Sequence, residues 1–274
     1  MIVTRDSFEK AVITAINTEA TVFDSMESYL KTAENYVRIT ILGDAIYNDF
    51  NSLPQDIKNS IASLISLKGF ADAIPFLDLI LTPTGFGVVS TETLAPASKE
   101  RVDRLLSRVI YAAEDATDLL ILNLHASLND KWSKTNQFTS LIDSLFWTAE
   151  DLRKYGGMPS AHRSDLLSSR SKIWEAEELI KKKISSEFYK EILDSMRKRN
   201  LSPENTKILH FMKILVGHFL SGAIGAFNDG MDSLINVLEA NIENFKTYAG
   251  STAYQIKHFQ HYENNKEDST FFFG

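Results

Sequence analysis

Apolar residues recur every three or four positions along most of the chain, whereas strand-like alternation of apolar and polar residues is scarce. This period gathers apolar side chains on one face of an α-helix, so the sequence predicts an all-α protein, a bundle of about six to eight helices. The clearest stripe follows Ser98, a residue type that caps helices, with Glu100 in the first turn. Its members are Val102, Leu105, Leu106, Val109, Ile110, Ala113, Thr117, Leu120, Ile121 and Leu124.

Turn-forming residues predict where the following helices end. A second stripe runs from Phe138 to Leu152 and stops before Gly156 and Gly157, with Pro159 beyond, which is typical of a helix C-terminus. A longer helix, dense in charge, is expected from about residue 166 to about residue 200.

The last long helix is expected to begin at Ser202-Pro203-Glu204, which supplies a cap, a first-turn proline and a first-turn acid, and to run to about Tyr248. Within it, Gly217, Ser221 and Gly225 repeat at four-residue spacing. This spacing predicts a face of small residues that another helix can approach closely, and core packing is favoured over an oligomer contact.

One segment, Leu81 to Ser98, departs from the helical pattern. Pro83 disfavours helix in the residue before it, and the neighbouring glycines favour turns. Residues 87–90 are expected to form a short strand that pairs with residues 93–95. The sequence therefore predicts a β-hairpin or extended insert near residues 82–97.

Three regions are expected along the chain. Residues 1–97 form N-terminal helices plus the hairpin insert, residues 98–250 form a long-helix bundle that packs with them as one globular unit, and residues 251–274 form an extended C-terminal tail. The tail is too polar for a core of its own, yet it carries three consecutive phenylalanines. Burying one is worth about 2 kcal/mol, so the tail is expected to dock on its own helices or on a neighbouring subunit.

Composition narrows the classes of function. The chain of 274 residues is 44% hydrophobic, carries a net charge of −7 and has no cysteine. The lack of cysteine excludes disulfides and thiolate chemistry and favours a cytoplasmic protein, and the N-terminal residues lack the apolar core of a signal peptide. The net charge opposes direct binding of nucleic acid, and the basic runs 181–183 and 197–199 are typical of a solvated helix face.

A membrane partner is not expected either. Residues 208–227 form the most apolar stretch, about long enough to cross a bilayer, but they include Lys213, His210 and His218. A lysine near the centre of a spanning helix costs about 3 kcal/mol, so a buried helix of a soluble protein is favoured.

The sequence predicts no catalytic residue, no cofactor and no metal ligand. Ser28 to Lys31 and Ser195 to Lys198 have the serine–lysine spacing of penicillin-recognising enzymes, but the companion motifs are missing. His258 and His261, followed by Glu263, could hold a metal, although unliganded histidines are the expected state.

Two motifs carry a resemblance to a known family. The stretches LTPTGFGVVS, residues 81–90, and APASKERV, residues 95–102, resemble the signature of uncharacterised proteins encoded in prophage-like and mobile regions of Bacteroides-type bacteria. The two stretches cover about a tenth of the chain, and the family has no catalytic residues to transfer. The resemblance implies a component of virion assembly, of the head-to-tail adaptor kind.

The leading hypothesis is a non-enzymatic structural or assembly protein, cytoplasmic or virion-associated, whose partners are copies of itself or other assembly proteins. The hairpin, the small-residue helix face and the tail would make its contacts. The alternative is a helical ligand-binding protein or enzyme with a pocket between the two helical halves, where Asp78, Tyr47, Trp174 and His210 could meet. The expected interaction residues are Thr84, Gly85, Phe86, Gly87, Val88, Val89, Phe271, Phe272 and Phe273.

Overall fold

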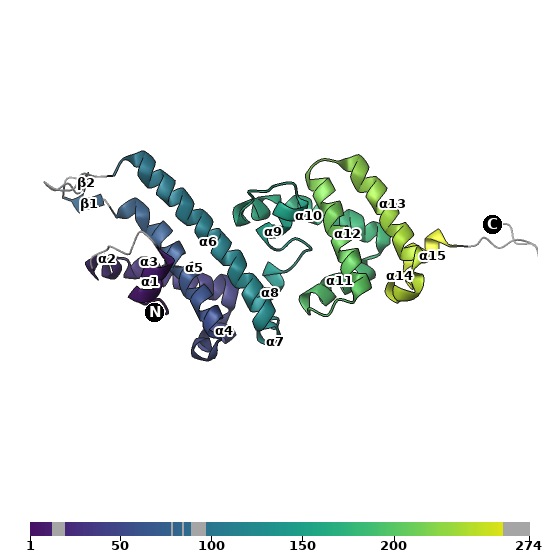
Figure 1. Cartoon of the computed structure of the whole chain (residues 1–274), viewed down its shortest axis with the longest axis horizontal. Helices are drawn as coiled ribbons and strands as arrows, with labels where there is room; N and C mark the ends of the chain where they lie inside the picture. Colours follow the sequence, from purple (N-terminus) through teal and green to yellow (C-terminus); the bar gives the residue numbers. More distant parts are fainter. Residues whose placement is uncertain (13–19, 78, 84, 89–96, 260–274) are drawn as a thin grey trace, which may run out of the picture. The chain divides into compact units, whose positions relative to one another are not determined.

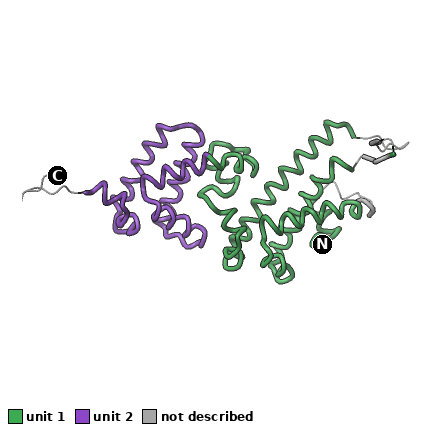
Figure 2. Tube along the Cα trace, turned by 180° about the vertical axis from the view of Figure 1, so that it is seen from behind, with its two compact units in different colours: residues 1–171 green, residues 172–274 purple. Residues whose placement is uncertain are grey.

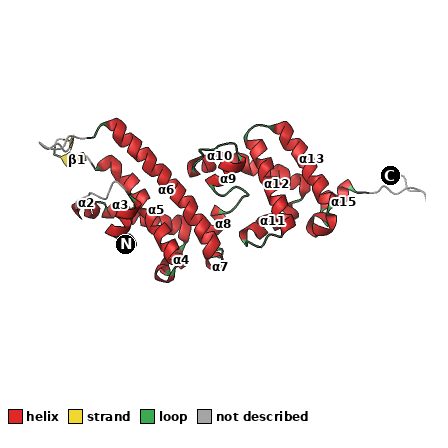
Figure 3. Ribbon diagram, in the orientation of Figure 1, coloured by secondary structure: helices red, strands yellow, loops and turns green. Residues whose placement is uncertain are grey.

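The computed structural model describes residues 1–12, 20–77, 79–83, 85–88 and 97–259. Helices make up most of this part of the chain (Figures 1 and 3), so the predicted all-helical class is confirmed. The predicted number of six to eight is wrong, because the described residues form fifteen α-helices. Several long apolar stripes are divided into shorter helices by caps and turns inside them.

The chain forms two compact units, residues 1–171 and residues 172–274 (Figure 2). Their boundary falls inside α10 (Arg163–Ile184) and does not coincide with the expected boundary at residue 97. Two helices on either side of that expected boundary, α5 (Gln55–Ala73) and α6 (Lys99–Ser127), pack against each other within the first unit.

The core of the first unit forms where α3 (Glu27–Val37), α5 and α6 pack together. A Cβ atom at Gly69 of α5 would lie 3.2 Å from the Cα atom of Leu30, so glycine allows the close approach of α3 and α5. The short helix α1 (Arg5–Ala11) covers α5 and buries Phe8. The core of this region includes Leu30, Ala33, Val37, Ile57, Ile61, Leu64, Ile65, Val109, Leu120, Ile121 and Leu124.

A π-helical turn, η2 (Arg38–Leu42), follows α3 and ends at Gly43, whose φ of 73° favours glycine. Side chains from far along the chain bind carbonyl groups of this turn. The Trp132 indole N–H donates to the Ile41 oxygen over 2.8 Å, and the Gln137 amide donates to the Ile39 oxygen over 2.8 Å. These bonds fix α7 (Asn129–Trp132) and α8 (Asn136–Leu141) on the turn.

The two described strands, β1 (Leu79–Thr82) and β2 (Gly85–Val88), form an antiparallel pair in which Thr82 lies opposite Gly85. The predicted pairing of residues 87–90 with residues 93–95 falls largely on residues that the structure does not describe, and it stays a prediction. Gly85–Val88 pairs backward with the preceding apolar run, because a two-residue connection is the shortest route to a strand partner. Residues 89–96 lie outside the described residues.

Three of the helices that the sequence predicted as continuous are interrupted. The stripe from Phe138 to Leu152 belongs to α8 and to α9 (Ala149–Tyr155), separated by a non-helical stretch in which Ile142, Leu145 and Phe146 are still buried. A capping box between Thr148 and Asp151 starts α9, and the predicted end before Gly156 is confirmed.

The second interruption ends α10 at Ile184. Ser185 adopts φ 133° and ψ 149°, a conformation that is otherwise nearly restricted to glycine, and its hydroxyl accepts the N–H of Phe188 over 3.0 Å. This cap begins α11 (Ser186–Arg197), so the charged stretch forms two helices.

The helix predicted from Ser202 to Tyr248 begins as expected but is also divided. Ser202 caps α12 (Pro203–Leu220), which ends before Gly222, where φ is 75°, and α13 (Ile224–Ala240) follows. The predicted small-residue face is lost at this break, and a Cβ atom at Gly225 would meet nothing within 4 Å. The close contact between α12 and α13 lies instead at Gly230, where a Cβ atom would meet Leu215.

Shorter elements complete the two units. They are α2 (Ala20–Ser25), α4 (Asp44–Asn48), η3 (Phe50–Ser52), η4 (Ile74–Phe76), η5 (Ile242–Asn244), α14 (Lys246–Ala249) and α15 (Thr252–Lys257).

Candidate interaction groove

The second unit contains a groove whose floor is α13. Phe227, Met231 and Ile235 follow one another at four-residue spacing, and each is buried. The row beside them, Asn228, Asp232 and Asn236, has the same spacing and is exposed to solvent. Because positions four apart lie on one helix face, α13 presents an apolar row and a polar row side by side.

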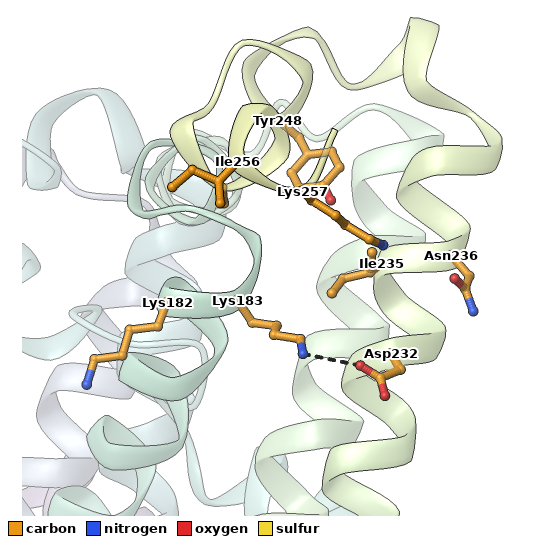
Figure 4. A pocket seen from close by; sticks show the side chains of 9 residues that line it. Lys182, Lys183, Asp232, Ile235, Asn236, Tyr248, Ile256 and Lys257 are labelled. Carbon is orange, nitrogen blue, oxygen red and sulfur yellow. Dashed lines mark ion pairs between the residues drawn. The ribbon is translucent and has the colours of Figure 1, made fainter. Parts of the chain in front are cut away.

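The walls of the groove are the last turns of α10 and the helix α15 (Figure 4). Two cavities of about 540 and 310 Å³ meet at Lys182, Lys183 and Asp232, and together they extend along α13. Each wall contributes an apolar residue and lysine at helical spacing. The wall residues are Leu179, Lys182 and Lys183 from α10, and Ala253, Ile256 and Lys257 from α15.

The rim of the groove is apolar as well as basic. Ile256 is 72% exposed and Leu179 is 38% exposed, whereas the apolar row of α13 beneath them is buried. A single exposed aliphatic side chain is ordinary, but exposed apolar side chains on both walls of one groove form the kind of patch that binds another chain.

The charge of the groove opposes that of the whole chain. Three lysines and one carboxylate line the two cavities, although the protein carries a net charge of −7. Lys183 lies 3.3 Å from Asp232, and Lys257 lies 2.8 Å from Glu239. Lys182 forms no ion pair with any residue that the structure describes. The groove is therefore suited to an acidic segment with apolar side chains.

Glu239 of α13 holds α15 in place. Its Oε1 atom accepts hydrogen bonds from Lys257 Nζ over 2.8 Å and from the Tyr248 hydroxyl over 3.5 Å, and it lies 3.2 Å from His258 Nε2. The hydrogen bond from Lys257 holds the pKa of Glu239 below its ordinary value. Burial, together with Glu239, raises the pKa of Tyr248 to about 12.

This anchor predicts a response to acid. A carboxylate with a lowered pKa in the folded state contributes stability above the ordinary glutamate pKa of about 4.3, and this contribution is lost as the pH falls through the lowered value. Below pH about 4, we expect the amides of Thr252–Lys257 to lose protection in hydrogen exchange before those of α12. Glu239→Gln should remove this pH dependence. Equal protection of α15 at pH 3 and pH 6 would contradict the assigned anchor.

The predicted interaction residues lie elsewhere. Gly85, Phe86, Gly87 and Val88 form β2 in the first unit, and their backbones pair with β1. The other predicted positions, Thr84, Val89, Phe271, Phe272 and Phe273, lie outside the described residues. That these residues contact a partner remains a prediction.

The residues of the alternative pocket do not form one site within either unit. Tyr47 belongs to the first unit, where its hydroxyl donates to Glu34 over 2.6 Å, and this hydrogen bond raises the pKa of Tyr47. Trp174 and His210 belong to the second unit, on α10 and α12. Asp78 lies outside the described residues.

A polar cluster in the first unit joins α6 to α9 and to the start of α10. Asp118 of α6, which is buried, accepts the N–H of Ala149 over 2.6 Å and a hydrogen bond from Arg163. Asp115 accepts a hydrogen bond from Arg153 over 2.6 Å. Burial raises the pKa of Asp118 although Arg163 opposes the shift. The cluster fastens the three helices together.

A cavity of about 250 Å³ lies beside this cluster, between α5, α6 and the first turns of α10. Its charged residues balance one another. Lys68 lies 3.6 Å from Asp72, and Glu114 accepts two hydrogen bonds of 2.9 Å from Ser164. Such a lining offers less to a charged partner than the lysines of the groove do.

Neither a metal cluster nor a membrane span is found in the part of the chain that the structure describes. No three histidine or acidic side chains there gather closely enough to hold a metal ion. His258 contacts Glu239, and the other two residues of the candidate metal set, His261 and Glu263, lie outside the described residues. The described helices also lack the combination of length and apolar character that crossing a bilayer requires.

These observations define an all-helical protein with a basic, apolar-floored groove in its second unit. Residues 20–141, less than half of the chain, match a family of unknown function (DUF6712). The matched residues belong to the first unit and extend from α2 to α8, so the groove lies outside them. No curated protein and no solved structure matches the chain.

Sequence reasoning did not identify the groove, although one signal for it was present. Leu179, Lys182 and Lys183 share a helix face, and Ala253, Ile256 and Lys257 repeat the same spacing. Such a face is also typical of a solvated helix, so the spacing alone does not identify a binding surface. The meeting of the two faces over α13 depends on the turns at Ser185 and Gly222.

Proposed function

We propose that the chain is a non-enzymatic structural protein that self-associates or joins a larger assembly, as a virion component of the head-to-tail adaptor kind. The groove of the second unit is the contact surface in this proposal. The observation that carries it is the largely exposed Ile256 beside Lys182 and Lys257, above the apolar row of α13.

The shape of the groove favours a protein–protein contact over a site for a small-molecule ligand or substrate. A site that binds a small molecule encloses most of the ligand among apolar walls with a few convergent polar groups. The two cavities are instead open to solvent, with Lys183 paired to Asp232 across the gap between α10 and α13 and Lys182 turned away from it (Figure 4). An arrangement with an apolar centre and a charged rim is usual for protein–protein interfaces.

The virion role is the more specific part of the proposal. It is supported by the LTPTGFGVVS and APASKERV stretches, which resemble proteins of prophage-like regions. The neighbouring genes would decide this part, because capsid, portal or tail genes beside this one are expected if the chain belongs to a virion.

Light scattering of the full chain at rising concentration tests the proposal. We expect self-association, and we expect Lys182→Glu combined with Ile256→Asp to raise the midpoint concentration at least tenfold. The double substitution removes a cation and places a carboxylate on the apolar rim, so it opposes an acidic, apolar partner.

Lys207→Glu is the matched control, since Lys207 is an exposed lysine on α12 and does not line the groove. It makes the same charge change as Lys182→Glu alone, in the same unit, and should leave the midpoint within about twofold. A chain that stays monomeric at every concentration, or that loses association equally with Lys207→Glu, would count against the proposal.

A further inference from the structure

The sequence of this chain contains a segment whose pattern complements the groove. Residues 260–274, which lie outside the described residues, include the acids Glu263, Glu267 and Asp268, followed by three phenylalanines at 271–273. Acidic residues therefore precede a compact aromatic group within fifteen positions. The groove has the opposite charge on its rim and apolar side chains on its floor.

The groove can receive both parts of this pattern. Lys182, Lys183 and Lys257 line the cavities, and Lys182 has no ion pair with a described residue, whereas Lys183 pairs with Asp232 and Lys257 with Glu239. Leu179 and Met231 line the end of the groove that lies away from α15, together with Phe227. A thioether and an aromatic ring are favourable contacts for further aromatic rings.

The lengths also agree. From Phe227 to Asn236, the face of α13 that lines the groove extends roughly 14 Å at 1.5 Å per residue. Residues 260–270 can span up to about 36 Å when extended. The acids can thus pass the lysines while the phenylalanines reach the end of the groove.

We propose that the groove of one copy binds residues 260–274 of a second copy, with the acids against the three lysines and Phe271–Phe273 beside Leu179 and Met231. This inference rests on the proposed function, because it names the partner of an assembly surface. The donating and receiving surfaces differ, so the contact is heterologous and generates a ring or an open filament of copies.

Reciprocal complementation tests the inference with full-length chains. One variant carries Lys182→Glu and Lys183→Glu and keeps its phenylalanines, and the other carries F271S, F272S and F273S and keeps its groove. Each variant alone should remain monomeric at concentrations where the unsubstituted chain assembles. Their equimolar mixture should form a dimer that does not grow further, because each pair retains one working contact.

A disulfide experiment locates the contact, and it is clean because the chain has no native cysteine. Asn228 is exposed on α13 beside the far end of the groove. A chain with Asn228→Cys and Ser269→Cys should form intermolecular disulfides at least tenfold faster than a control chain with Lys207→Cys and Ser269→Cys. Equal rates would overturn the inference, and so would a disulfide formed within one chain.

The outcomes separate this inference from the proposed function. If the phenylalanine variant assembles like the unsubstituted chain while the lysine variant does not, the inference fails and the proposed function stands. If the unsubstituted chain is monomeric, the proposed function fails. In that case the inference fails with it, because no second copy is bound.

Discussion

Replacing Trp132 with alanine is expected to lower the free energy of unfolding by about 4 kcal/mol. The Trp132 side chain is fully buried, and its ring packs edge-on against Phe138 at a centroid distance of 5.2 Å. The substitution leaves a large cavity and deprives the Ile41 carbonyl of the indole N–H that it accepts over 2.8 Å. Urea denaturation followed by circular dichroism measures the loss.

Two further variants separate the two causes of this loss of stability, the lost N–H donor and the lost buried ring. Trp132→Phe keeps a ring but removes the N–H donor, so a smaller loss of about 1–2 kcal/mol is expected. Trp174→Ala removes the same residue type from a position that is 47% exposed, and it should cost less than about 1 kcal/mol. If Trp132→Ala and Trp174→Ala had equal effects, the role assigned to Trp132 in docking α7 would be wrong.

The helix type and many helix starts could be predicted because local chemistry decides them. Ser98 precedes α6 as the stripe and its first-turn acid indicate, although its hydroxyl makes no capping hydrogen bond, and at α12 the Ser202 hydroxyl accepts the N–H of Asn205 over 3.0 Å. In each of these cases the cap lies within a few residues of the apolar row that it precedes. No distant part of the chain is needed to place such a start.

The interruptions could not be predicted from period alone, since the apolar spacing continues across them. Leu145 and Phe146 keep the expected spacing and are buried, yet they lie in a non-helical stretch. Burial there is achieved by irregular backbone, and the capping box of Thr148 and Asp151 restarts the helix. The capping-box residues Thr148 and Asp151 stand in the sequence where α9 restarts, and that pattern marks the break that the apolar period conceals.

Other features depend on tertiary contacts. The π-turn Arg38–Leu42 binds the side chains of Trp132 and Gln137, which lie 91 and 98 residues from their acceptors. Lys182 and Lys183 were expected on a solvated helix face, and they are exposed. What the sequence could not show is that α13 and α15 stand opposite them, which turns a solvated face into the wall of a groove.

Asp118→Ala is expected to lower the free energy of unfolding by about 3 kcal/mol, because it removes one partner of a buried ion pair. The side chains of Asp118 and Arg163 are each 11% exposed, so the substitution leaves the guanidinium poorly hydrated and without its carboxylate. The N–H of Ala149, at the start of α9, loses its acceptor as well.

Thermal and urea unfolding measure the change, and Glu100→Ala is the matched control. Glu100 pairs with Arg104 on the same helix but is 81% exposed, so its loss should cost less than about 0.5 kcal/mol. Equal costs at the two positions would mean that the Asp118 cluster does not fasten α9 and α10 to α6.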